Sequence, residues 1–313
     1  MIRLAGAVGA GVMGLSVVFL VGMAEASGRT LDVGPGHDLK RPSAAAAIAR
    51  DGDVVRIEPG DYVDCAVWTA NRLVIAGKGP GVVIRTKVCE AKALFVIRGR
   101  DITVRDLTFT GARAPDANGA GIRAEGRNLT VERSRFIDNE DGILSASDPQ
   151  STIRIIDSDF IRNGSCEKAC AHGVYINAVG LLRIERSKFL ENKIAHHIKS
   201  RALATELIGN EILDGETGTS SYLVDIPNGG SVLMEGNVLE KGRLTSNPGT
   251  AISIGAEGVK HPTAALIFRQ NRFSNRLDSS TIFVRNLTNT DAVLLGNQFV
   301  GKVTPLSGKG SVR

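Results

Sequence analysis

The clearest pattern in the chain is a short phrase of alternating apolar residues that recurs along most of its length. Each copy has apolar residues at every second position, then Ser or Asn, one variable residue, and a Phe, Ile or Leu. Examples are LTVERSRFIDN from residue 129, IRIIDSDFIRN from 153 and LRIERSKFLEN from 182. Alternation with a period of two is typical of β-strands that bury one face.

The last apolar residue of each phrase marks a repeat whose length stays within narrow limits. These anchor residues lie 23 to 34 residues apart, and they are Phe109, Phe136, Phe160, Phe189, Ile212, Leu239, Phe273 and Phe299. Short strands and turns that repeat at this interval predict a solenoid in which each repeat forms one coil. Leucine-rich repeats share the interval, but the leucine consensus and the helical half that they require are missing here.

We therefore predict an all-β fold, a single-stranded right-handed parallel β-helix. Its apolar residues would stack inside, and its Ser or Asn side chains would stack at a turn, where they satisfy backbone groups that strand pairing does not reach. Residues 41–50, within RPSAAAAIARDGD, begin with Pro42 and present an Ala/Ile face. They predict a helix that caps the first coil.

The first residues indicate export. Residues 1–26 combine one early Arg, an apolar run and an Ala-x-Ala ending, which predicts a cleaved signal peptide; an uncleaved anchor is the alternative. The mature chain, residues 27–313, would be one domain, secreted or periplasmic, without membrane contact after removal of the leader. Such compartments favour disulfides. We expect Cys65 to pair with Cys89, one repeat away and hence on the next coil, and Cys166 to pair with Cys170.

The amino-terminal third also resembles a known superfamily. The stretch SAAAAIARDGDVVRIEPGDYVDCAVW, followed by LVIAGKGPGVVIR, is similar to the amino-terminal signature of pectate-lyase-like right-handed β-helix proteins. The resemblance implies this fold for nearly the whole mature chain. It does not imply one reaction, because the superfamily includes polysaccharide lyases, glycoside hydrolases, uronate epimerases and proteins without catalytic activity.

Composition adds a preference for anionic partners. The formal net charge is +5, aromatic residues make up 4% and no run of five basic residues occurs. These values favour an acidic ligand such as a polysaccharide over nucleic acid. We expect a monomer and no cofactor or metal. Calcium is left open, because the candidate carboxylates near the middle of the chain are scattered among arginines.

Candidate chemistry gathers in three segments that the repeat brings into register. When EDGILSA, AHGVYIN and AHHIKSR are aligned by coil, they bring five side chains together on one outer strand face, namely His172, Tyr175, His197, Lys199 and Arg201. His196 stacks near His172, and the following coil adds Asp225 and Asn228. Three of the five histidines of the chain fall in this cluster.

These residue types suit β-elimination on a uronate polymer. The reaction needs a base for the C5 proton, a proton donor for the leaving oxygen and positive charge beside the carboxylate. If the likeness to lyases holds, His197 or Lys199 would be the base, Tyr175 the acid, and Arg201 with His172 the carboxylate clamp; His196, Asp225 and Asn228 would contact substrate. The alternatives are a uronate C5-epimerase, a glycoside hydrolase and a non-catalytic carbohydrate-binding solenoid.

Overall fold

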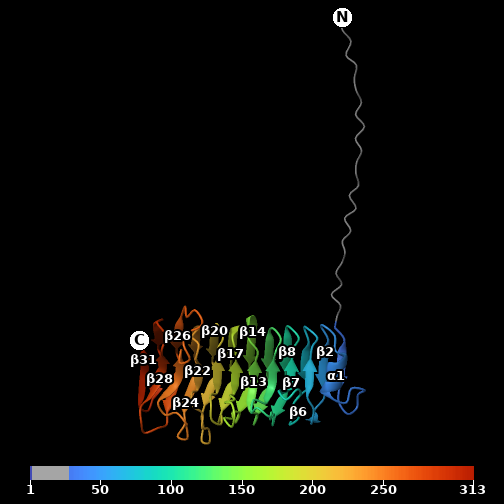
Figure 1. The fold of residues 1–313 in the computed structure, drawn as a ribbon, viewed down its shortest axis with the longest axis horizontal. Coiled ribbons are helices and arrows are strands. Elements are labelled where there is room, and N and C mark those ends of the chain that lie inside the picture. Colours follow the sequence, from blue (N-terminus) through green and yellow to red (C-terminus); the bar gives the residue numbers. More distant parts are fainter. Residues whose placement is uncertain (2–27) are drawn as a thin grey trace.

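The computed structural model describes Met1 and residues 28–313, so the predicted signal peptide lies outside the described residues. The described chain winds into an elongated solenoid whose strands run across its long axis (Figure 1). Between β2 and β31 each coil contributes one strand to each of three parallel sheets, which confirms the right-handed parallel β-helix. No helix within residues 28–313 is long and apolar enough to cross a membrane.

We name the three sheets A, B and C in the order in which each coil passes through them. Sheet A consists of β1 (Thr30–Val33), β2 (Val54–Ile57), β5 (Val74–Gly77), β8 (Ile102–Arg105), β11 (Leu129–Glu132), β14 (Asp148–Ile156), β17 (Val179–Glu185), β20 (Ala204–Ile208), β23 (Ser231–Glu235), β26 (Leu266–Arg269), β29 (Ala292–Leu295) and β32 (Gly310–Val312).

Sheets B and C have one strand per coil in the same order. Sheet B consists of β3 (Gly60–Tyr62), β6 (Val82–Arg85), β9 (Thr108–Thr110), β12 (Arg135–Ile137), β15 (Asp159–Ile161), β18 (Lys188–Leu190), β21 (Glu211–Leu213), β24 (Val238–Lys241), β27 (Arg272–Asn275) and β30 (Gln298–Val300). Sheet C consists of β4 (Ala66–Trp68), β7 (Ala93–Ile97), β10 (Ala120–Ala124), β13 (Asp141–Ser145), β16 (Val174–Ile176), β19 (Ile198–Ser200), β22 (Val224–Ile226), β25 (Thr250–Ile254), β28 (Thr281–Asn286) and β31 (Val303–Gly308).

The anchor residues stack in the core as the repeat predicts. The rings of Phe109, Phe136, Phe160 and Phe189 follow one another with centroids 5.1, 4.7 and 4.7 Å apart and nearly parallel planes. All four side chains are buried. Parallel in-register pairing puts identical side chains on adjacent coils, so a column of Phe fills the interior without gaps.

The predicted Ser and Asn stack lies at the turn between sheets A and B. At each step a side-chain oxygen accepts the backbone N–H of the residue one coil earlier, through Ser134, Ser158, Ser187, Asn210, Asn237, Asn271 and Asn297. The residue before each of these has positive φ, and glycine fills that position at 209, 236 and 296. The sharp turn thus keeps its buried donors paired.

The predicted amino-terminal helix and the two predicted disulfides are present, although the helix is shorter than predicted. A helix, α1 (Pro42–Ile48), lies at the amino-terminal end and buries Pro42 and Ala45. It is shorter than the expected range 41–50, and its role as a cap stays a prediction. Both expected disulfides are present, Cys65 with Cys89 and Cys166 with Cys170.

Candidate functional site

The outer face of sheet C carries a row of side chains in strict register. Strand pairing aligns Leu144, Tyr175, Lys199, Asp225 and Ser253 on β13, β16, β19, β22 and β25. Each is the strand residue that points away from the core, because its neighbours in sequence point inward. Adjacent coils lie about 4.8 Å apart, so Tyr175, Lys199 and Asp225 are direct neighbours.

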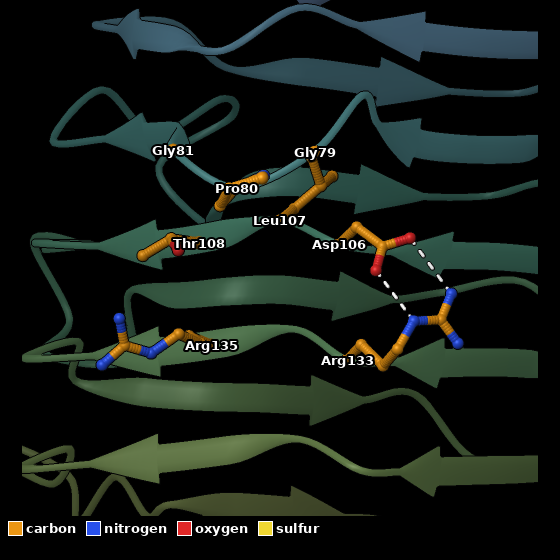
Figure 2. Close-up of a pocket in the computed structure, with 8 residues that line it drawn as sticks. All are labelled: Gly79, Pro80, Gly81, Asp106, Leu107, Thr108, Arg133 and Arg135. Atoms are coloured by element: carbon orange, nitrogen blue, oxygen red, sulfur yellow. Dashed lines mark hydrogen bonds and ion pairs between the residues drawn. The ribbon is translucent and has the colours of Figure 1, made fainter.

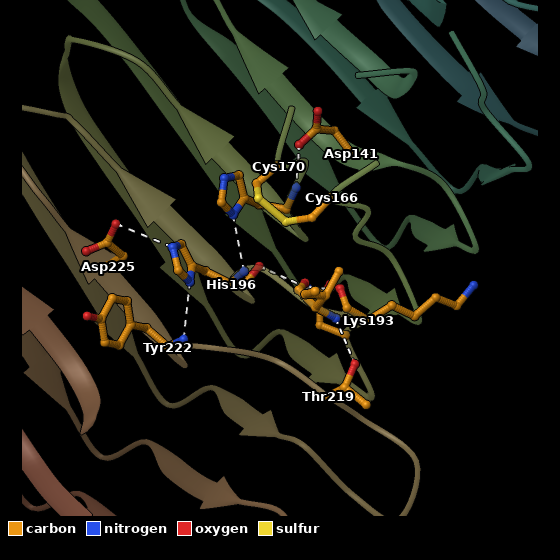
Figure 3. Close-up of a disulfide and its surroundings, with 11 residues drawn as sticks. Asp141, Cys166, Cys170, Lys193, His196, Thr219, Tyr222 and Asp225 are labelled. Atoms are coloured by element: carbon orange, nitrogen blue, oxygen red, sulfur yellow. Dashed lines mark hydrogen bonds and ion pairs between the residues drawn. A yellow bond between two sulfur atoms is a disulfide. The ribbon is translucent and has the colours of Figure 1, made fainter. Parts of the chain in front are cut away.

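A second row lies three residues earlier on each coil and is joined by hydrogen bonds. His172 N donates to Asp141 Oδ1 (2.7 Å), His196 N donates to His172 Nδ1 (3.2 Å), and Tyr222 N donates to His196 Nδ1 (3.1 Å). Figure 3 shows His196 between Asp141 and Tyr222 near the Cys166–Cys170 disulfide, with Asp225 beside the His196 ring. A backbone N–H can only donate, so Nδ1 of both histidines is an acceptor and the proton of each neutral ring is on Nε2.

The aromatic rings of the two rows pack against one another. The rings of His172 and His196 stack at 4.8 Å, and those of His196 and Tyr222 at 5.1 Å. Tyr175 meets His172 edge to face at 5.0 Å. The ammonium of Lys199 and the guanidinium of Arg201 lie 5.6 and 5.5 Å from the ring centre of Tyr175. Both cations therefore lie over the face of the same phenol ring.

Both stacked histidines are neutral. Burial lowers the pKa of His196 to about 3, and the nearby charge of Lys199 acts in the same direction. Burial also lowers the pKa of His172 well below its usual value, with further contributions from His196, Lys199 and Arg201. Each ring therefore carries its single proton on Nε2, and Nε2 of His196 lies 3.6 Å from Asp225 Oδ2. His172 is 2% exposed and its Nδ1 accepts from His196 N, so it contacts His196 rather than solvent; its expected part in the substrate clamp stays a prediction.

An acidic loop residue neutralises the two cations. Glu257, which follows β25, accepts from Lys199 Nζ at 2.9 Å and from Arg201 Nη2 at 2.7 Å. Lys199 Nζ also lies 3.6 Å from Asp225 Oδ2. Burial would raise the pKa of Glu257, but the hydrogen bond and charge of Lys199 outweigh it and lower the pKa. Burial raises the pKa of Asp225 to about 6.

The expected outward position of His197 is wrong. The side chain is 1% exposed, and Nε2 donates to Asp214 at 3.0 Å. Asp214 also accepts from Ser220, and Lys241 Nζ lies 4.0 Å from it. Strand β19 begins at Ile198, so the strand alternation does not extend back to His197. The bend before the strand turns His196 outward and His197 inward, which removes His197 from the candidate catalytic groups.

Asn228 also lies away from this face. It is 2% exposed, and its Nδ2 donates to Gly258 O at 3.4 Å. Its backbone carbonyl accepts from Lys260 N at 2.8 Å and from His261 N. Asn228 therefore supports the loop that carries Glu257. The structure thus brings together six of the eight predicted site residues, and they are His172, Tyr175, His196, Lys199, Arg201 and Asp225.

Two members of the site were missed in the sequence. Tyr222 precedes Asp225 by three residues, as His172 precedes Tyr175 and His196 precedes Lys199. Applying the same three-residue spacing to the coil that contains Asp225 would have identified Tyr222. Glu257 lies in a loop outside the repeat, so no pattern in the sequence indicates its contact with Lys199.

A second open region lies near the amino-terminal end. This depression, of about 400 Å³, is bordered by the turn 79–81 and by Arg135 (Figure 2). Figure 2 shows Arg133 directed at Asp106, to which it donates at 2.8 and 3.1 Å. Arg135 lies 3.6 Å from Asp159. Paired, exposed ions of this kind are typical of a solvated surface, so the depression is the weaker candidate.

Metal binding has no obvious centre in the described part of the chain. Within residues 28–313 no group of three or more His, Cys, Asp and Glu side chains is arranged to hold an ion. The two carboxylates of the candidate site, Asp225 and Glu257, both face Lys199.

Comparison with known proteins identifies the fold class. No family model matches the chain, and no curated protein matches it. Among solved structures, an alginate lyase from Paenibacillus sp. str. FPU-7 superposes with a TM-score of 0.60 at 15% identity, over 90% of this chain and 98% of the lyase. Pectate lyase Pel9A superposes with a TM-score of 0.56 at 14% identity, over 90% of this chain and 79% of Pel9A. The chain therefore has the pectate-lyase-like right-handed parallel β-helix fold.

Proposed function

We propose that the outer face of sheet C binds an acidic, uronate-containing polysaccharide and cleaves it by β-elimination. One observation carries the proposal. The ring of Tyr175 lies beside two cations, Lys199 and Arg201, and packs on the neutral ring of His172, which in turn stacks on neutral His196. This is the combination that removal of a proton beside a carboxylate requires.

The groups divide the reaction as follows. Lys199 and Arg201 neutralise the substrate carboxylate, which makes the C5 proton removable. The phenolate oxygen of Tyr175 takes this proton, the C4–O4 bond breaks as the C4=C5 double bond forms, and the hydroxyl group thus formed on Tyr175 gives the proton to the leaving oxygen. The ion pairs with Glu257 (2.9 Å) and Asp225 (3.6 Å) hold the ammonium group of Lys199 in place, so we assign it to the carboxylate clamp rather than to the base.

The similar solved structures support this choice at the level of the fold. Both are named as lyases, one of alginate and one of pectate. At 14 to 15% identity they do not define residue roles, so the assignment rests on the contacts of Tyr175, Lys199 and Arg201. Export, as predicted from residues 1–26, and the two disulfides agree with an extracellular polymer as substrate.

A panel of uronate polymers tests the proposal. Polymannuronate, polyguluronate and polygalacturonate are incubated with the protein, and the ultraviolet absorbance of the unsaturated product is followed. We expect one polymer to give a rising signal, and Lys199→Met to lower the rate about 100-fold or more. Lys188→Met, which removes a lysine paired with Glu211 at 3.1 Å on sheet B, is the matched control and should keep full activity. Binding without product would instead favour a non-catalytic solenoid.

Hydrolysis is the second candidate, and one observation favours it. Burial raises the pKa of Asp225 to about 6 while Glu257 stays ionised beside Lys199. Two carboxyl groups with pKa values moved apart are the groups that a glycoside hydrolase uses. New reducing ends without ultraviolet absorbance would identify this reaction. A changed uronate stereochemistry without cleavage would identify an epimerase.

A further inference from the structure

Glu257 occupies a site formed by two cations. Its two oxygens are divided between them, Oε1 on Lys199 and Oε2 on Arg201, at 2.9 and 2.7 Å. The Glu257 side chain is 40% exposed, whereas those of Lys199 and Arg201 are 12% and 24% exposed. The carboxylate therefore lies on the solvent side of the cations, where a ligand would approach.

The loop that carries Glu257 is held by its backbone, independently of this side chain. Glu257 N donates to Pro227 O at 2.9 Å, and Lys260 N donates to Asn228 O at 2.8 Å. Gly255 and Gly258, with φ of 82° and 88°, make the turns on either side. The Glu257 side chain can therefore rotate away from the cations while the backbone of the loop stays in place.

Glu257 does not supply hydrogen-bond partners for all of the polar atoms around it. Arg201 Nε and Asp225 Oδ1 are buried and have no hydrogen-bond partner among the described residues. Buried polar atoms without partners are costly and uncommon in native proteins. A sugar acid offers a carboxylate for the two cations, and its hydroxyl groups can donate to Asp225 or accept from Arg201. A uronate residue therefore matches this site more completely than Glu257 does.

We propose that Glu257 is an internal stand-in for the substrate carboxylate, and that a uronate residue displaces it from Lys199 and Arg201. This inference rests on the proposed function for the identity of the ligand. The exchange replaces one carboxylate with another, so neither cation is left unpaired at any stage. A neutral sugar cannot make this exchange. Glu257 thereby lowers the affinity of the site for acidic polysaccharides, which must displace it, whereas a neutral sugar leaves it in place.

Calorimetry on Glu257→Gln tests the displacement. The ligands are trisaccharides of mannuronate, guluronate and galacturonate, each with its carboxyl-reduced, neutral counterpart. We expect the variant to bind the acidic trisaccharide at least about tenfold more tightly than the wild type, with little change for the neutral one. Glu235→Gln is the matched control, because Glu235 pairs with Arg269 at 2.8 Å on sheet A. Equal or weaker binding of the acid by Glu257→Gln would overturn the inference.

A second arm does not depend on the polymer. Crystals of Glu257→Ala are grown with acetate, and we expect an acetate whose oxygens bridge Lys199 Nζ and Arg201 Nη2. Water alone at this position would contradict the inference even if the wild type cleaves a uronate polymer. Conversely, a bridging acetate in a protein that forms no unsaturated product would refute the β-elimination and leave the carboxylate site intact.

Discussion

The turn between sheets A and B and the outer face of sheet C both stack polar side chains at intervals of one coil, but with opposite results. At the turn, Asn237 uses every group of its amide. Its oxygen accepts from Asn210, and its nitrogen donates to Leu207 O and Asn271 Oδ1. On sheet C the two stacked histidines each accept one hydrogen bond, through Nδ1, and Tyr175 makes no hydrogen bond through its hydroxyl within residues 28–313.

This difference separates a stack of side chains that stabilises the fold from one that can bind a ligand. Seven buried side-chain atoms of the described residues have no partner, and six of them belong to strands of sheet C or to the residue after one, namely Trp68, Arg123, Asp141, Arg201, Asp225 and Ser253. The turn contributes none of these seven. A column whose hydrogen bonds are all made stabilises the coil, whereas unused donors and acceptors remain free for a ligand.

Removing the Tyr175 hydroxyl should have the largest effect on activity. Tyr175→Phe keeps the ring that packs on His172 but cannot transfer a proton, so we expect a loss of about 10²–10⁴-fold in the cleavage rate. Thermal melting should show no loss of stability. Tyr62→Phe is the matched control, because its hydroxyl donates to Glu58 O near the amino-terminal end. It should cost about 1 kcal/mol of stability and no activity; a Tyr175→Phe protein that keeps its rate would remove Tyr175 from the mechanism.

Truncating an Asn of the stack at the turn between sheets A and B should lower stability and leave the activity of the folded protein unchanged. Asn237→Ala leaves the Asn210 N–H and the Leu207 carbonyl without partners in the interior, and we expect a loss of about 3 kcal/mol in the free energy of unfolding. Asn289→Ala, at an exposed position, should change it by less than about 0.5 kcal/mol. Urea denaturation measures both. If Asn237→Ala abolished activity without loss of stability, the division between the two columns would be wrong.

The smallest expected effect is a change in the pH dependence of stability. Asp225 has a pKa of about 6 in the folded protein, above its usual 3.8, because burial favours its protonated form. The stability that this protonation contributes is therefore lost as pH rises from about 4 to 6. His196, with a pKa of about 3 against 6.5, contributes stability that is lost as pH falls from 6.5 towards 3. The two effects oppose each other, and the other charged groups facing Asp225 are Lys199, Arg201 and Glu257.

Asp225→Asn removes the pH-dependent contribution of Asp225 to stability and keeps that of His196. We expect the variant to gain about 2 kcal/mol at pH 7 relative to pH 4, compared with the wild type. Denaturant unfolding at both pH values measures the difference. An unchanged difference between the two pH values would show that Asp225 titrates at its ordinary pKa and does not share the buried environment of His196.

The sequence predicted the fold because the solenoid repeats its interior. Phe136 and Phe160 occupy equivalent positions on adjacent coils, and Cys65 pairs with Cys89 one coil away. The apolar repeat and the cysteine spacing therefore supported the same coil length. The same register brought Tyr175 and Lys199 together. It failed at His197, since alternation holds only within a strand and this residue precedes one. It gave no sign of Glu257, whose loop lies outside the repeat.

The most direct test of the account is a crystal structure of Tyr175→Phe with the acidic trisaccharide that the wild type turns over. We predict that the sugar lies across β16, β19 and β22, with one carboxylate between Lys199 and Arg201 and with Glu257 turned away. A sugar bound in the depression beside Arg135, or a sugar on sheet C that leaves Glu257 on both cations, would contradict it.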